Sequence, residues 1–125
     1  MYGDSLEEIV NEINILKKLK GTKIAPEYYE SWICKKNDIL FIYIAEERMS
    51  MSYGDWLDEG NINNNDVLEK LKKKLDKLHE MGIVHLDFHT GNIMLKINEE
   101  KEIEPYINDF GISKFNNQLF DDRKK

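Results

Sequence analysis

The sequence predicts a mixed α+β domain, because segments with a helical period alternate with segments that are typical of strands. Apolar residues recur at three- and four-residue intervals over residues 5–19 and 66–81, which predicts two amphipathic helices. Aromatic and β-branched residues fill 28–33 and 39–44, and the polar turn between them predicts an antiparallel hairpin. The chain has 125 residues, which is enough for one domain with a modest core.

Shorter elements account for the rest of the chain. Gly21 and Gly82 follow the two predicted helices and are expected to end them. One or two helical turns are expected at 53–57. Three short strands are expected at 83–85, 92–97 and 104–108.

The bulk composition limits the classes of partner. The formal net charge is -6 and the basic residues are scattered, so no nucleic-acid partner is expected. No apolar run approaches the roughly 20 residues that cross a bilayer, and the N-terminus lacks a signal-peptide pattern. We therefore expect no membrane partner and a cytoplasmic location. The single cysteine, Cys34, lies in an apolar run and is predicted to be a buried thiol.

Two motifs carry the chemical signal. The first is HLDFHTGN at 85–92, and the second is DFG at 109–111, which begins 22 positions after Asp87 (109 minus 87). In this order, each after a predicted short strand, they resemble the catalytic loop and the metal-binding motif of the protein-kinase-like superfamily. The resemblance implies a partial protein-kinase-like fold and the activity of a serine/threonine-protein kinase.

The resemblance also implies ATP and Mg²⁺ as cofactors and a role for each residue of the motifs. Asp87 matches the catalytic residue that accepts or orients the proton of the substrate hydroxyl. Asn92 matches a metal ligand through its amide oxygen, and Asp109 matches the main magnesium ligand. His85 is expected to make a structural hydrogen bond near the loop.

The resemblance extends to the other predicted elements. The helix at 5–19 resembles the regulatory helix of the small lobe, in which Glu12 matches the ion-pairing glutamate. Together with Asp109, the resemblance implies six further cofactor-binding residues: Glu12, Glu46, Glu47, Met49, His89 and Asn92. The implied domain plan has a small-lobe remnant at 1–45, an adenine-binding hinge at 46–52, and the start of the large lobe at 53–125.

The sequence departs from the family at both ends. Complete kinases have a glycine-rich loop and a strand lysine before the helix glutamate, whereas the eleven residues before Glu12 contain one glycine and no lysine. Fourteen residues follow Gly111, too few for the C-terminal helices. We therefore expect a truncated domain that is weak or inactive alone. A partner chain is expected over the apolar face of Leu71, Leu75 and Leu78.

Three other interpretations remain open. The form H-x-D-x-H-x-G-N, with His89 in place of the usual lysine, also resembles aminoglycoside and choline phosphotransferases. A non-catalytic, pseudokinase-like interaction module is the second alternative. The third takes His85, Asp87 and His89 as ligands of a metal such as zinc. The pattern as a whole also resembles divergent kinase-like proteins of large DNA viruses.

Overall fold

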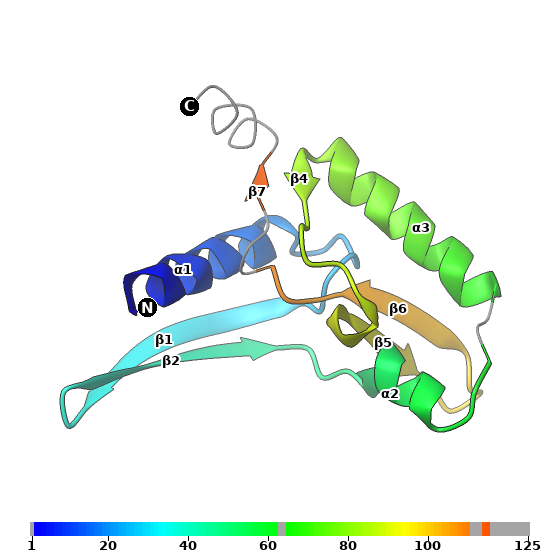
Figure 1. Ribbon diagram of the computed structural model, residues 1–125, viewed down its shortest axis with the longest axis horizontal. Helices are drawn as coiled ribbons and strands as arrows, with labels where there is room; N and C mark the ends of the chain where they lie inside the picture. Colours follow the sequence, from blue (N-terminus) through cyan, green and yellow to red (C-terminus); the bar gives the residue numbers. More distant parts are fainter. Residues whose placement is uncertain (1, 63–64, 111–113, 116–125) are drawn as a thin grey trace.

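The described residues form three small antiparallel sheets with helices packed against them, which confirms the predicted α+β class (Figure 1). The computed structural model describes the backbone of residues 2–62, 65–110 and 114–115 and the side chains of 6–62 and 65–110. The elements, in order, are α1 (Tyr2–Lys18), β1 (Tyr28–Lys36), β2 (Ile39–Glu46), β3 (Met51–Ser52), α2 (Tyr53–Asp58), α3 (Asn65–Glu80), β4 (Ile83–Val84), η1 (Thr90–Asn92), β5 (Ile93–Ile97), β6 (Ile103–Ile107) and β7 (Lys114–Phe115).

Helix α1 lies over one face of the β1–β2 hairpin. It begins three residues earlier than predicted, and Gly21 follows its C-terminal end with a φ of +82°, a conformation that glycine adopts without strain. Ile15 and Leu16 near that end are buried. The helix is therefore anchored to the core by its C-terminal half.

The hairpin turn is tighter than predicted. Strands β1 and β2 pair from Tyr28↔Glu46 to Lys36↔Ile39, which leaves only Asn37 and Asp38 in the turn. Both residues have positive φ, +53° and +63°, as type I′ hairpin turns require. Asparagine and aspartate tolerate this region better than other residues with a side chain, so the two-residue turn suits this sequence.

The second sheet has the strand order β3-β5-β6, and α3 packs against β6. Ile93 of β5 is opposite Ile107 of β6. Lys74 of α3 reaches the sheet, where its ammonium group lies 2.8 Å from Oε1 of Glu104 and 4.0 Å from the ring centre of Tyr106. The end of this ladder positions the candidate site described below.

Two expectations about burial are wrong. Leu71 and Leu78 were expected on a bare apolar face, but both are buried in the core and Leu75 packs against it, because α3 covers β6 with that face. Cys34 was expected inside, but it is exposed, since the outer face of the hairpin has no second layer among the described residues. Whether a partner chain binds α3 stays a prediction. Within the described part of the chain, no helix combines the length and apolar character needed to cross a membrane.

Candidate active site

The loop between β4 and η1 is built around His85, which is almost fully buried. Its Nδ1 accepts a hydrogen bond from the backbone N–H of Asp87 at 3.2 Å, and its Nε2 lies 2.7 Å from the carbonyl oxygen of Asn108. Because Nδ1 accepts, Nε2 carries the proton and donates to Asn108. The ring also packs edge-on against Phe110, with centroids 5.1 Å apart. These contacts confirm the structural hydrogen bond expected of His85.

Asn92 connects this loop to the second sheet. Its side-chain Nδ2 donates to the carbonyl oxygen of Asp87 at 2.8 Å and lies 3.3 Å from the carboxylate Oδ2 of the same residue. Because both neighbouring oxygen atoms of Asp87 are acceptors, the amide nitrogen of Asn92 faces them. The amide oxygen of Asn92 therefore faces the opposite way. The carbonyl oxygen of Asn92 accepts from the backbone N–H of Asn108 at 2.8 Å. The loop and the end of β6 are thus joined at one residue.

Asp109 follows this junction directly. Its φ is +59°, a left-handed conformation that non-glycine residues seldom adopt, and Phe110 beside it is completely buried. The hydrogen bonds of Asn108 on one side and the buried ring of Phe110 on the other fix the backbone of Asp109. The side chain of Asp109 is exposed. Strain of this kind is typical of functional sites. Gly111, the last residue of the motif, lies outside the described residues.

His89 lies over the same loop. Its Nδ1 accepts from the backbone N–H of Gly91 at 3.1 Å, and its Nε2 lies 3.7 Å from Oδ1 of Asp87 and 3.1 Å from Nδ2 of Asn92. A Cβ atom at Gly91 would lie only 2.9 Å from Cε1 of His89, so the ring position depends on the glycine. The structure brings His89 to both motif residues.

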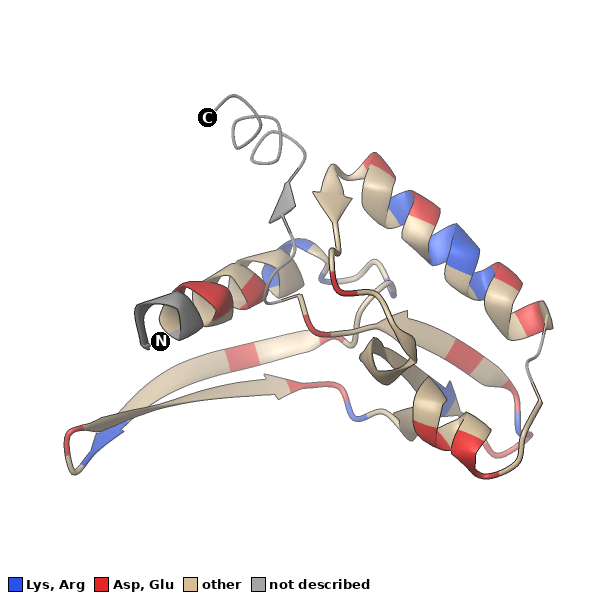
Figure 2. Cartoon of the chain, in the orientation of Figure 1, with Lys and Arg blue, Asp and Glu red and all other residues tan. Residues whose placement is uncertain are grey.

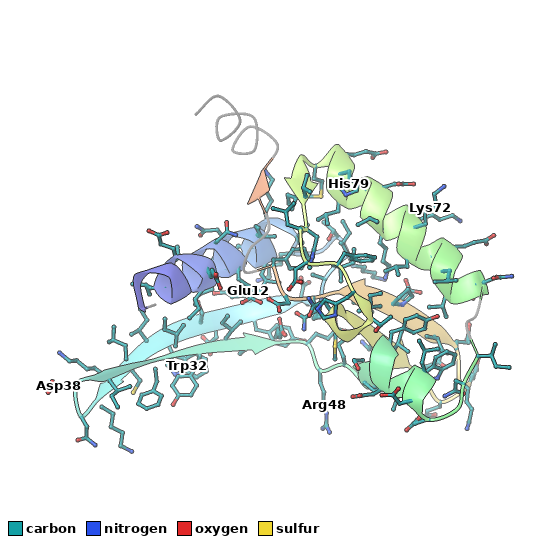
Figure 3. All side chains as sticks on the ribbon, viewed as in Figure 1. Glu12, Trp32, Asp38, Arg48, Lys72 and His79 are labelled. Atoms are coloured by element: carbon teal, nitrogen blue, oxygen red, sulfur yellow. The ribbon has the colours of Figure 1, made fainter. Side chains whose placement is uncertain are left out.

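Glu12 on α1 points toward the same region and is half-buried (Figure 3). Burial raises the pKa of its carboxyl group, and the nearby charges of Asp109 and Glu46 raise the pKa further, while a hydrogen bond from the backbone N–H of Phe110 opposes the shift. None of the ion pairs in the described part of the chain includes Glu12. The three acids therefore form a cluster that disfavours further negative charge.

The residues expected in the hinge differ in their surroundings. Glu46 ends β2, and burial raises the pKa of its carboxyl group. The carboxylate of Glu47 instead pairs with Lys96 on β5, and that hydrogen bond lowers its pKa. Met49 lies half-buried between β2 and β3. The structure brings Glu46 near Glu12, but it directs the side chain of Glu47 toward Lys96.

A histidine-based metal site does not fit this geometry. Both ring nitrogens of His85 are used by Asp87 and Asn108. In the described residues, no group of three or more His, Cys, Asp and Glu side chains could hold a metal ion. Asn92 and Asp109 offer two oxygen ligands, and Mg²⁺ commonly binds through one or two carboxylates together with substrate phosphates and water. The donor set therefore fits Mg²⁺ better than zinc.

Some residues of the site were not found from the sequence. Asn108 and Asn11 act on the motif through main-chain contacts, and Nδ2 of Asn11 donates to the carbonyl oxygen of Phe110 at 3.2 Å. Because these contacts involve backbone atoms, which every residue has, they produce no recognisable pattern of side-chain types in the sequence. Gly91 could have been found, because a glycine next to functional polar residues often marks a close approach.

A family model described as "Protein kinase domain" matches residues 2–121. The chain belongs to the protein kinase family. The order of helix, hairpin, loop motif and DFG motif is therefore that of a kinase domain, as the resemblance implied. The match covers both motifs and Glu12.

Individual relatives agree with the family. The chain is 30% identical over 113 residues to a probable serine/threonine-protein kinase, fnkE, from Dictyostelium discoideum, an alignment that covers 86% of this chain and 8% of the relative. It is 27% identical over 114 residues to a probable myosin light chain kinase of the same organism, covering 87% and 28%. It is 28% identical over 113 residues to the KEOPS complex subunit Bud32 of Pyrococcus abyssi, covering 90% and 48%. The chain spans less than half of each relative, and the viral resemblance stays a prediction.

Proposed function

We propose that this kinase-family chain provides the catalytic loop and metal-binding residues for transfer of the ATP γ-phosphoryl group to serine or threonine hydroxyls of a protein. The observation that supports this most is the double role of Asn92. Its side chain holds Asp87, and its main chain holds the residue before Asp109. One residue therefore sets the relative position of the two acids that the reaction needs.

In this proposal Asp87 orients the substrate hydroxyl and accepts its proton, because its carboxylate is partly exposed and held by Asn92. Asn92 and Asp109 would hold Mg²⁺ through their side-chain oxygen atoms. When bound, the ion offsets the charge that develops on the transferred phosphoryl group. The buried contacts of His85 and Phe110 keep Asp109 in place during the reaction.

The nucleotide-binding residues are also proposals. We assign adenine binding to the segment of Glu46, Glu47 and Met49. For Glu47 this rests on backbone groups, since its carboxylate already pairs with Lys96. Glu12 would take part through a cation that neutralises it.

We further propose that these 125 residues transfer phosphate slowly. Glu12, Glu46 and Asp109 form an acidic cluster, and no described basic side chain forms an ion pair with Glu12. ATP brings further negative charge to this region, and without an offsetting cation its phosphates bind poorly. Mg²⁺ alone would then have to supply the compensation.

Calorimetric titration with ATP and Mg²⁺ tests the nucleotide site. Asp109→Ala is expected to abolish Mg²⁺-dependent binding, whereas Asp58→Ala, an exposed acid on α2, should leave it unchanged. Binding that ignores Mg²⁺, or equal loss in both variants, would contradict the assignment. No binding by a folded chain would favour the non-catalytic interaction module.

A transfer assay separates the two enzyme alternatives. His89 contacts Asp87 and Asn92, which favours the small-molecule phosphotransferase as a second candidate because this histidine is part of that resemblance. The assay offers a mixture of serine and threonine peptides in parallel with choline and an aminoglycoside. Phosphate on peptides that disappears in Asp87→Asn supports the kinase; phosphate only on a small molecule supports the alternative.

A further inference from the structure

Both main-chain groups of Phe110 are bound by side chains of helix α1. Nδ2 of Asn11 donates a hydrogen bond to the carbonyl oxygen of Phe110 at 3.2 Å, and the carboxylate of Glu12 accepts one from the N–H of the same residue. Phe110 is completely buried and belongs to no helix or strand. Buried main-chain groups outside regular structure need partners from side chains or water. Helix α1 supplies these partners to Phe110.

Asn11 lies next to the part of α1 that is anchored in the core. Ile15, four residues further along, lies on the same face of the helix and is fully buried, and Leu16 and Leu19 are buried beside it. Asn11 is half-buried and faces the interior from the turn before this anchor. Its hydrogen bond therefore ties the anchored half of α1 to a residue 99 positions away in the sequence.

The contact acts on Asp109 through the main chain. The left-handed conformation of Asp109, with a φ of +59°, is costly for a residue with a side chain and persists only where the surroundings enforce it. On one side, Asn92 and His85 bind the main chain of Asn108. On the other side, the hydrogen bonds of Phe110 come from α1. Loss of a partner on this side is expected to let Asp109 leave the left-handed region.

Asn11 makes this contact without adding charge. Acidic residues occur on α1, at the end of β2 and just after β6 (Figure 2), and the charges of Glu46 and Asp109 act on Glu12. A lysine at position 11 could bind the same carbonyl oxygen, but its charge would also attract these carboxylates. The neutral amide holds Phe110 and leaves the carboxylate of Asp109 available to a metal ion.

We propose that Asn11 is a positioning residue for the metal-binding acid: by holding Phe110 to α1, it keeps Asp109 in its left-handed backbone conformation. The role of Asp109 as a Mg²⁺ ligand is the one proposed above, on which this inference rests. Groups that orient a metal ligand commonly contribute roughly ten- to a hundredfold to metal affinity. Because Asn11 acts through the neighbouring residue and not on the carboxylate itself, an effect of about tenfold is expected.

Hydrogen exchange of single amides, measured by NMR without nucleotide, tests the positioning by itself. In the wild-type chain the amide of Phe110 should be protected, although it lies outside regular structure. Asn11→Leu, which has nearly the same size but no donor, should speed exchange at Phe110 by about tenfold and leave the amides of β5 unchanged. A general loss of stability would speed exchange in β5 as well.

Two further variants complete the exchange experiment. Asn11→Ala removes the donor without adding bulk and should act like Asn11→Leu, so a folding defect of the leucine variant would not hide the effect. Asn14→Leu is the matched control, because Asn14 is exposed on the same helix. Its amides should exchange like those of the wild type.

Calorimetric titration with ATP and Mg²⁺ tests the consequence for the metal site. Asn11→Leu should weaken Mg²⁺-dependent binding by about tenfold, whereas Asn14→Leu should bind like the wild type. If the wild type bound no ATP, the proposed function would fail, and the exchange measurement would still decide whether Asn11 holds Phe110. An unprotected Phe110 amide in the wild type, equal effects of Asn11→Leu and Asn14→Leu, or Mg²⁺-dependent binding that Asn11→Leu leaves intact would each overturn the proposal.

Discussion

The ring of His85 and the carbonyl oxygen of Asn108 are joined by a 2.7 Å hydrogen bond that crosses from the catalytic loop to the end of β6. The contact lies one residue before Asp109, and Phe110 packs edge-on against the same ring. The loop motif and the DFG motif, 22 positions apart in the sequence (109 minus 87), thus share one buried histidine. A change at this histidine is expected to disturb both.

Replacing His85 with alanine is expected to destabilise the fold by about 2–3 kcal/mol. The change leaves the Asn108 carbonyl without its donor and removes a buried ring from beside Phe110. Urea unfolding followed by circular dichroism measures the loss. His79→Ala is the control, because His79 is exposed on α3 (Figure 3) and should change stability by less than about 0.5 kcal/mol. Equal effects would show that the ring of His85 is not a structural link.

Asn92→Asp is expected to cost about 2–3 kcal/mol at neutral pH. The substitution exchanges an amide donor for a carboxylate that faces the carbonyl and carboxylate oxygens of Asp87. The cost should shrink at acid pH, where one carboxylate takes up a proton. Asn98→Asp provides the comparison, because the Asn98 amide also donates to a carboxylate, that of Glu102, but on an exposed turn. A loss at Asn98 as large as that at Asn92 would contradict this account.

Much of the fold was predictable because local patterns and packing agree. The helical periods of α1 and α3 and the aromatic and β-branched residues of the hairpin predicted these elements, and the family match covers them. The predicted turn was too long. It included Lys35 and Lys36 because they are polar, but both residues belong to β1. Polarity marks exposure, and an exposed strand end has the same composition as a turn.

The burial of individual residues was harder to predict than the elements. An apolar run such as that around Cys34 predicts a buried strand only if a second layer covers it, and the described chain has none there. The leucines of α3 show the converse, since β6 covers them. The resemblance of the two motifs to those of kinases implied Asp87, Asn92 and Asp109 as site residues, but the link through the backbone of Asn108 needed the structure.

Lys74→Met is expected to destabilise the domain by about 1–2 kcal/mol. The ammonium group hydrogen-bonds the carbonyl oxygen of Pro105, pairs with Glu104 and lies over the ring of Tyr106, so the substitution leaves a buried carbonyl without its donor. Burial of the charged ammonium group is unfavourable and lowers the pKa of Lys74. Methionine removes this cost, which offsets part of the loss.

Lys72→Met is the matched control for Lys74, because Lys72 extends from the outer face of α3 (Figure 3). It should change the free energy of unfolding by less than about 0.5 kcal/mol. Thermal and urea unfolding of both variants measure the difference. If Lys74→Met were as stable as Lys72→Met, the contacts between α3 and β6 through this lysine would contribute no net stability.

Glu12→Gln is expected to stabilise the chain at neutral pH. Burial and the charges of Asp109 and Glu46 raise the pKa of Glu12 in the folded state, so between the unfolded and folded pKa values the native chain holds more protons than the unfolded chain. The free energy of unfolding therefore falls as pH rises through that window. Glutamine removes the charge and can still accept the hydrogen bond from Phe110, so the variant should lose this part of the pH dependence.

Glu47→Gln should show the opposite sign. The hydrogen bond from Lys96 lowers the pKa of Glu47, so its contribution is present above the unfolded pKa and is lost as pH falls through the folded value. The substitution should therefore cost up to about 1 kcal/mol at neutral pH, as exposed ion pairs do, and nothing in acid. Urea unfolding from pH 3 to pH 8 compares the two variants. If Glu12→Gln also destabilised the chain at neutral pH, the charge of Glu12 would be favourable in the folded state. The acidic cluster would then not explain slow phosphate transfer.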